Sequence, residues 1–411
     1  MDFEDTEEEA RFRTEARSWL ERHAPAKGAA GDFSSGYLEG TMSEDDHIRL
    51  SKQFQRTLFD HGWAGITWPV GFGGRGGTSM EAAIFAQEQA RFGVSVGAFA
   101  VGIGMAGPTI MKHGSDDQRA RYLTAMLRGD EVWCQLFSEP GAGSDLAGIS
   151  TRAERDGDVW VITGQKVWTS SGGSSDWGIL LARSNPDVAK HKGITYFLVD
   201  MASAGFDIRP LRQMTGSSHF SEVFLDEVRI PQDQVLGEVD HGWTCAITTL
   251  SNERGLIAGG NRSSDTQALV DLTARLDRTD DDALRQRLAD CWTRQQIQRY
   301  HGLRAQTAMS RGRPPGAETS IMKLYAAEYL RRLGNTALEV LGPDGMLTGD
   351  GPDAGEWQAR FLHAPAIRIA GGSNEIQRNI VGERVLGLPR DVRVDREAPF
   401  RELGHLAQPP K

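Results

Sequence analysis

Apolar residues recur with a helical period over the first third of the chain. Phe12, Ala16 and Trp19 follow one another at spacings of four and three, which places them on one face of a helix. A glycine-rich run at 71–77 interrupts this pattern, and it is too dense in glycine for the interior of a helix or a strand. We therefore expect residues 1–130 to form a helical domain that contains a glycine loop.

From about residue 130 the apolar period changes to two. Short apolar runs alternate with turn formers such as Asp156-Gly157. The runs lie at 159–163, 167–169, 179–182, 194–199, 223–225 and 228–230. Short, closely spaced strands of this kind favour a compact antiparallel barrel or sandwich over βαβ units, so we predict a central β-barrel domain at 131–236.

The helical period returns after residue 237, with Trp243, Ile247 and Leu250 on one face of the first helix. Turn formers break the pattern at 277–282, 313–316 and 342–345. This spacing predicts a bundle of four or five helices over residues 237–390. The tail at 391–411 has little apolar periodicity, and we expect an extended or partly disordered arm. The fold class is then α+β, mainly α.

Composition narrows the class of protein. The 411 residues are 39% apolar and 25% charged, and no stretch approaches the roughly 20 apolar residues that a membrane span requires. A net charge of −10 argues against a nucleic-acid surface. Cys134, Cys245 and Cys291 form no CxxC pair, which argues against a zinc site and a disulfide framework. The acidic amino terminus carries no signal pattern, so we expect a cytoplasmic protein without a metal.

Two polar segments of the central domain have the composition of ligand-binding loops. Residues 138–145 read Ser-Glu-Pro-Gly-Ala-Gly-Ser-Asp, and residues 164–171 read Gly-Gln-Lys-Val-Trp-Thr-Ser-Ser. The glycines allow the backbone to approach a ligand, and the hydroxyls and amides can donate hydrogen bonds. Trp168 and its neighbouring hydroxyls can flank a flat ring such as an isoalloxazine. The alternatives are a polar turn for the first segment and a core position for Trp168.

A third segment, residues 370–379, places a glycine loop before a helix with the sequence Ala-Gly-Gly-Ser-Asn-Glu-Ile-Gln-Arg-Asn. Free amides at a helix amino terminus bind phosphate groups readily. The alternative is a simple helix cap.

The order and spacing of these three segments resemble the acyl-CoA dehydrogenase family. Gly-Ile-Thr-Trp-Pro at 65–69, Arg-Gln-Met-Thr-Gly at 212–216 and Glu-Arg-Val-Leu-Gly at 383–387 strengthen the resemblance, which covers nearly the whole chain. It implies a helical amino-terminal domain, a small antiparallel β-barrel and a carboxyl-terminal four-helix bundle. It also implies FAD as the cofactor and removal of hydrogen from the α and β carbons of an acyl-CoA.

The resemblance carries over site residues position by position. The residues that it assigns to FAD are Phe137, Ser138, Gly143, Ser144, Trp168, Ser170, Gly372, Ser373 and Glu375. Ser144 would also meet the pantetheine part of the thioester, and Arg254 is a further substrate contact. Hydrogen-bond donors near the flavin ring favour its reduced, negatively charged form.

The catalytic base departs from the commonest family pattern. Many relatives carry a glutamate before the third motif, but that position here is Gly371. Some relatives carry the base on a bundle helix within Leu-x-x-Glu-Arg, and residues 250–254 match this motif, so Glu253 is the candidate base. A backbone N–H near Gly371 can still hold the thioester carbonyl. The alternative is that Glu253 only pairs with a surface cation such as Arg262.

A second departure concerns the assembly. Homotetrameric relatives hold the FAD pyrophosphate of the adjacent subunit with Arg-x-x-Phe-Gly, whereas residues 275–282 here read Arg-Leu-Asp-Arg-Thr-Asp-Asp-Asp. Their acidic end would repel a pyrophosphate. The chain resembles an actinobacterial subset, some of which pair unlike subunits, so a homodimer, a homotetramer and a heteromer with a related subunit stay open. Electron-transferring flavoprotein is the implied electron acceptor.

Three other functions remain compatible with these motifs. A flavin monooxygenase or nitroalkane-oxidase-like enzyme would use the same fold, and a non-catalytic partner subunit would complete the FAD site of another chain. A carrier-protein thioester could replace the coenzyme A thioester. The acyl group stays open, with Trp68, Phe72 and residues 102–107 as candidate walls of its pocket.

Overall fold

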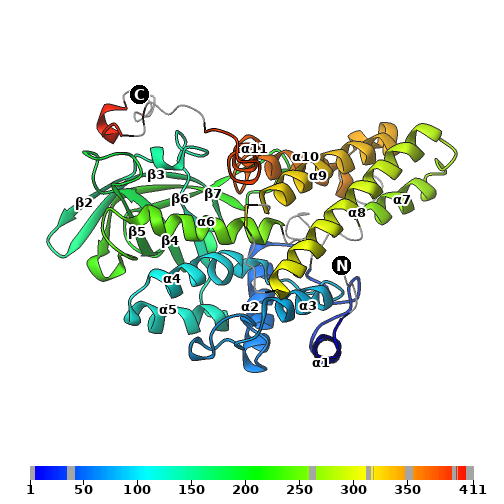
Figure 1. The fold of residues 1–411 in the computed structure, drawn as a ribbon, viewed down its shortest axis with the longest axis horizontal. Coiled ribbons are helices and arrows are strands. Elements are labelled where there is room, and N and C mark those ends of the chain that lie inside the picture. The colour runs from blue at the N-terminus through cyan, green and yellow to red at the C-terminus, as the bar shows by residue number, and fades with distance from the viewer. Residues whose placement is uncertain are drawn as a thin grey trace. The chain divides into compact units, whose positions relative to one another are not determined.

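The computed structural model describes residues 5–34, 42–258, 265–311, 316, 317, 319–347, 355–390, 395 and 397–403. Backbone contacts divide the chain into two compact units. The first unit comprises Met1–Ser18, Ser79–Ala90 and Arg254–Arg390, and the second comprises Trp19–Thr78, Arg91–Glu253 and Asp391–Lys411. Figure 1 shows the helices and strands of both units.

The first unit is helical. Its carboxyl-terminal helices α7, α8, α9 and α10 lie side by side (Figure 1). The helices of this unit are α3 (Ser79–Gln89), α7 (Asp265–Arg275), α8 (Asp282–Ser310), α9 (Thr319–Leu341), α10 (Glu356–Ile369), α11 (Asn374–Ile380) and the start of α1 (Glu7–His23). Leu272, Cys291, Tyr329 and Trp357 are buried in one apolar cluster among them. The helical period after residue 237 thus corresponds to helices, of which α7, α8, α9 and α10 each contribute buried residues to this cluster.

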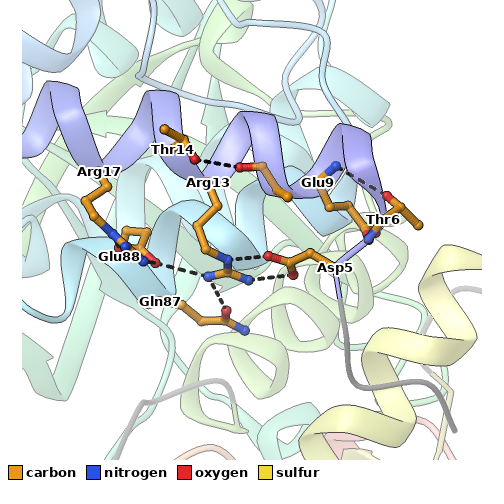
Figure 2. Close-up of polar contacts among 9 residues, drawn as sticks. Asp5, Thr6, Glu9, Arg13, Thr14, Arg17, Gln87 and Glu88 are labelled. Carbon is orange, nitrogen blue, oxygen red and sulfur yellow. Dashed lines mark hydrogen bonds and ion pairs between the residues drawn. The ribbon is translucent and has the colours of Figure 1, made fainter.

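A buried carboxylate connects α1 to α3 (Figure 2). Glu88 accepts hydrogen bonds from Arg17 Nε at 2.8 Å and from Arg13 Nη1 at 3.1 Å. Arg13 also donates to Gln87 and, through two of its nitrogens, to Asp5. Hydrogen bonding from Arg13 is the main reason that the pKa of Asp5 lies below its ordinary value. Since Glu88 is only 3% exposed, the two guanidinium groups supply the pairing that a buried charge requires.

The helices of the second unit are α2 (Glu44–Asp60), α4 (Gly107–His113), α5 (Asp116–Arg128) and most of α6 (Gly242–Ala258), with the end of α1. The glycine run at 71–77 forms the predicted loop, which includes a short 3₁₀ turn, Val70–Phe72. Trp68 is buried, and its ring would lie 2.4 Å from a Cβ built at Gly107. Trp68 is therefore a core residue within this unit.

Seven strands of the described chain form one curled sheet in the second unit. They are β1 (Trp133–Leu136), β2 (Arg152–Asp156), β3 (Val159–Ser170), β4 (Trp177–Arg183), β5 (Ile194–Asp200), β6 (Phe206–Leu211) and β7 (Phe220–Pro231). The order is β1-β4-β2-β3-β7-β6, with β5 pairing β4. All pairs are antiparallel except β1 with β4 and β2 with β4. Strands β3 and β7 each join two of the predicted apolar runs.

Helix α6 buries a different face from the predicted one. Cys245, Ala246 and Thr249 are buried, whereas Ile247 is 46% exposed. Small side chains allow a helix to approach its neighbour closely, which explains why the buried stripe follows them and not the larger apolar residues. No helix in the described part of the chain is long and apolar enough to cross a membrane.

Candidate active site

The loop after β1 begins with a buried anchor. Phe137 is 3% exposed and packs edge-on against Tyr196, with ring centroids 5.7 Å apart. The Ser138 carbonyl accepts a hydrogen bond from the Val167 amide at 3.0 Å, so this loop is tied to strand β3. Beyond it the chain turns outward, and both Gly143 and Ser144 are exposed. A Cβ built at Gly143 would meet no atom within 4 Å, so this glycine lies in open space.

Trp168 lies on a β-bulge near the end of β3. The register between β3 and β7 shifts between Lys166 and Thr169, and Trp168 has a φ of 61°. Its side chain is 57% exposed, and its ring meets Phe220 edge-on with centroids 5.8 Å apart. The core alternative for Trp168 is therefore wrong. A bulky residue in the left-handed region is rare and is found where function constrains the backbone.

These second-unit residues fit the edge and face of a flavin ring. Trp168 offers an exposed flat surface, and Ser138 and Ser170 are half-buried on the two segments that the Ser138–Val167 hydrogen bond joins. The hydroxyl of Thr169, between Trp168 and Ser170, is fully buried and makes no hydrogen bond within the described residues. Stacking, hydroxyl donors and an open glycine turn match a flat cofactor with a polar edge.

The glycine loop of the third motif lies in the first unit. Gly371 and Gly372 have φ values of 62° and 85°, which other residues adopt with strain. The Lys323 ammonium donates to the Gly372 carbonyl at 2.7 Å, and Gln377 donates to the Gly371 carbonyl at 2.9 Å. The loop backbone is therefore held by two buried side chains.

Ser373 and Glu375 follow this loop. The Ser373 hydroxyl accepts a hydrogen bond from the Ile376 amide at 3.3 Å and caps α11, so the cap alternative describes what this side chain does. Glu375 is exposed and pairs with Arg378 at 3.2 Å. The loop amides at Gly371 and Gly372 are thus the stronger candidates for contacting a ligand.

The candidate base lies on α6. Glu253 is half-buried, one helical turn after Thr249. The Thr249 hydroxyl is buried, at 2.9 Å from the Thr109 hydroxyl and 3.1 Å from the Tyr196 hydroxyl. Residues four apart share a helix face, so Glu253 continues the face that these hydroxyls anchor. The Arg254 side chain and Arg262, the cation considered for Glu253, lie outside the described residues.

The segment that replaces Arg-x-x-Phe-Gly forms the turn between α7 and α8. Arg278 donates to the carbonyls of Glu339 and Val340 at 2.7 and 2.9 Å. Asp281 accepts hydrogen bonds from the Ala283 and Leu284 amides, and these bonds help to hold its pKa below the ordinary value. Arg278 thus forms a bridge to α9 and Asp281 caps the start of α8, so both side chains serve the fold of the first unit.

Comparison with known proteins gives matches along most of the chain. The acyl-CoA dehydrogenase N-terminal, middle and C-terminal domain models match residues 6–130, 134–228 and 240–386. Acyl-CoA dehydrogenase IpdE1 of Mycobacterium tuberculosis is 38% identical over 386 residues, which cover 93% of this chain and 98% of IpdE1.

Two solved structures are similar over the same length. The Tcur3481-Tcur3483 steroid ACAD and the ChsE4-ChsE5 complex from Mycobacterium tuberculosis are each 28% identical, with TM-scores of 0.78. Each match covers 95% of this chain and 100% of the other. The predicted fold and the predicted cofactor class are confirmed. The chain therefore belongs to the acyl-CoA dehydrogenase family, whose members are oxidoreductases that bind FAD and dehydrogenate acyl-CoA thioesters.

Proposed function

We propose that Glu253 removes the α-proton of an acyl-CoA thioester in this enzyme. The observation that carries the proposal is the position of Glu253 on α6, half-buried and one turn beyond the buried Thr249 hydroxyl cluster. A carboxylate in a partly dry position accepts a proton more readily near neutral pH, because burial disfavours its charged form. Gly371 stands where many relatives have a glutamate, so that position offers no competing base.

The other residues bind and orient. Ser138, Trp168 and Ser170 would hold the flavin ring, and Ser144 and Arg254 would contact the thioester. The amide near Gly371 donates to the thioester carbonyl as negative charge develops there, supported by a loop that Lys323 and Gln377 hold. When bound, FAD would supply the hydride acceptor for the β-hydrogen. Phe137, Gly143, Gly372, Ser373 and Glu375 complete the proposed cofactor contacts.

The test is anaerobic reduction of the purified protein by a panel of saturated acyl-CoAs. The panel includes straight, branched and ring-bearing acyl groups, because one similar structure is a steroid ACAD. Bleaching of the flavin absorption by one thioester in wild type, but not in Glu253→Gln, supports the proposal. A flavin-loaded protein that no thioester reduces, but whose reduced flavin reacts rapidly with oxygen, would instead favour an oxygenase or oxidase.

A second candidate role is that of a subunit in a heteromer. Two observations favour it: the Arg278–Asp281 turn is committed to intramolecular contacts, and the similar structures include the ChsE4-ChsE5 complex. Purification of the chain alone tests this role through its flavin content. A chain that is colourless alone and yellow with a related subunit would support a heteromer, and a fully loaded chain alone would exclude the non-catalytic form. Electron-transferring flavoprotein is the proposed acceptor in either assembly.

A further inference from the structure

A buried ion pair joins the two candidate flavin segments of the second unit. Lys166 on β3 is fully buried, and its ammonium lies 2.8 Å from Glu139 Oε1. The same ammonium donates to the Phe137 carbonyl at 3.1 Å. Glu139 belongs to segment 138–145 and Lys166 to segment 164–171, so the contact connects the two motifs directly.

Every oxygen of the Glu139 carboxylate is used. Oε2 accepts hydrogen bonds from the Ser150 amide at 2.7 Å and the Ser150 hydroxyl at 3.0 Å. Oε1 accepts from the Thr151 amide at 2.9 Å in addition to Lys166. Burial by itself raises the pKa of Glu139, but the Lys166 charge and these hydrogen bonds outweigh it and hold that pKa below the ordinary value.

The pair lies beside the residues that meet the ring. Lys166 is two residues before Trp168, at the point where the register to β7 shifts. The Val167 amide, between them, donates to the Ser138 carbonyl. Consecutive positions on β3 therefore bind three consecutive positions of the loop: Lys166 binds Phe137 and Glu139, and Val167 binds Ser138.

We propose that Lys166 and Glu139 are positioning residues that hold Ser138 and the Trp168 bulge at a fixed separation, and so shape the flavin site. This inference rests on the proposed role of Ser138 and Trp168. A buried ion pair is a weak source of stability, because apolar residues of similar volume often stabilise a fold as well. What apolar residues could not supply is the directed bond from Lys166 to the Phe137 carbonyl, which fixes the loop against the strand.

The test compares Lys166→Met with the double variant Lys166→Met/Glu139→Gln. The single variant leaves a buried carboxylate without its cation and should lose much stability, whereas the double variant also removes that charge and should recover part of the loss. If the pair only stabilises the fold, the double variant should leave the flavin segments as they are in wild type. If the pair positions those segments, the double variant should still disturb them, because the bond to the Phe137 carbonyl stays lost. Arg152→Met, which breaks the exposed pair with Glu154 on β2, is the matched control.

The first readout needs no flavin. The protein contains 10 tryptophans, and 5-fluorotryptophan labelling gives each a fluorine resonance, with that of Trp168 assigned from Trp168→Phe. In the flavin-free double variant we expect the Trp168 resonance to shift or broaden while most others stay in place. In the loaded protein we expect FAD binding to weaken by about tenfold, or ~1.4 kcal/mol.

An unmoved Trp168 resonance together with FAD affinity within twofold of wild type would overturn the proposal. If the double variant does not fold, Glu139→Gln alone keeps the test open, because the Lys166 ammonium then loses the carboxylate that holds it at the Phe137 carbonyl: a smaller Trp168 shift supports the positioning role, and no shift overturns it. Failure of the proposed function is distinguishable, because it would appear as a wild-type protein that no thioester bleaches, whereas the fluorine measurement does not depend on turnover.

Discussion

At the scale of single residues, Trp168 combines a left-handed backbone with an exposed indole. Neither feature supports a core role, so the side chain contributes little to folding. We predict that Trp168→Asn keeps the free energy of unfolding within about 1 kcal/mol of wild type, because asparagine tolerates a positive φ. FAD retention should fall at the same time. Urea unfolding and flavin content measure the two effects, and a large loss of stability with intact FAD binding would contradict this prediction.

Gly107 and Gly302 should respond oppositely to alanine. A Cβ at Gly107 would lie 2.4 Å from the buried Trp68 ring, so Gly107→Ala should destabilise the protein by about 1–3 kcal/mol. Gly302 lies in the interior of α8 with no atom within 4 Å of an added Cβ. Gly302→Ala should stabilise by roughly 0.5–1 kcal/mol. Equal effects of the two substitutions on urea unfolding would refute the close packing of Trp68 on Gly107.

Sequence patterns predict where residues sit only while the alternation is regular. The bulge between Lys166 and Thr169 changes which residues face inward, so Trp168 is exposed and Lys166 is fully buried. The sequence does not reveal a bulge at that point, because no glycine marks it. The burial of Lys166 against Glu139 is a long-range contact, and no local pattern reports it.

At the scale of elements, α6 is attached to α4 through His113. The His113 Nε2 lies 2.9 Å from the Thr248 hydroxyl. Thr248 lies on α6, just over one helical turn before Glu253. Burial, and to a smaller extent the neighbouring Lys112, lowers the pKa of His113 below its ordinary value of 6.5. As pH falls through 6.5, the unfolded chain therefore takes up a proton that the folded chain does not, and stability falls.

His113→Gln should remove this part of the pH dependence. We expect the free energy of unfolding to decline less steeply between about pH 7 and pH 5 in the variant than in wild type. Denaturant titrations across this range measure the slope, with the exposed His241→Gln as control. An unchanged slope in His113→Gln would show that this histidine does not titrate as the structure implies.

The carboxyl-terminal segment 397–403 is docked, although its sequence shows little apolar periodicity. Phe400 is 7% exposed, and the Arg183 guanidinium lies over its ring at 4.0 Å. Lys190 pairs with both Asp145, next to Ser144, and Asp395. Phe400 and the shared Lys190 thus attach this part of the chain. Two isolated residues produce no periodic pattern in the sequence, so the attachment could not be predicted.

Phe400→Ala should loosen this attachment. We expect a loss of about 2 kcal/mol and faster hydrogen exchange over residues 184–193, because Arg183 loses its ring contact and Phe400 its burial. Arg401→Met, which removes an exposed pair with Asp187, should change little. Hydrogen exchange is measured by mass spectrometry. Exchange rates equal to wild type in both variants would contradict the docking of segment 397–403.

The long elements could be predicted from the sequence, and the short or polar ones could not. Strands β4 and β5 are nearly continuous apolar runs and were predicted. Strand β1 has only four residues, β2 buries only Ala153, and β6 contains a proline, so none carries a clear period. The prediction of which face of α6 is buried was wrong, because small residues, and not large apolar ones, form the contact.

At the scale of the whole molecule, the family motifs predicted the fold and the cofactor, because they occur along this chain in the same order as in the family. The domain boundaries at residues 130, 236 and 390 and the individual site assignments stay predictions. The candidate residues come from both compact units, Ser138, Trp168 and Glu253 from the second and Gly371 from the first. A local pattern can mark each segment, but a common role for the segments is implied only by the order of the motifs in the family.

The most direct test of the account is the rate of anaerobic flavin reduction in Glu253→Gln. With the best thioester of the panel, stopped-flow absorbance should show a loss of about 10²-fold or more relative to wild type, because the base is gone while the fold and flavin remain. Glu21→Gln, an exposed helical glutamate, is the matched control and should react like wild type. A Glu253→Gln protein that bleaches within a few-fold of the wild-type rate would show that another group removes the α-proton.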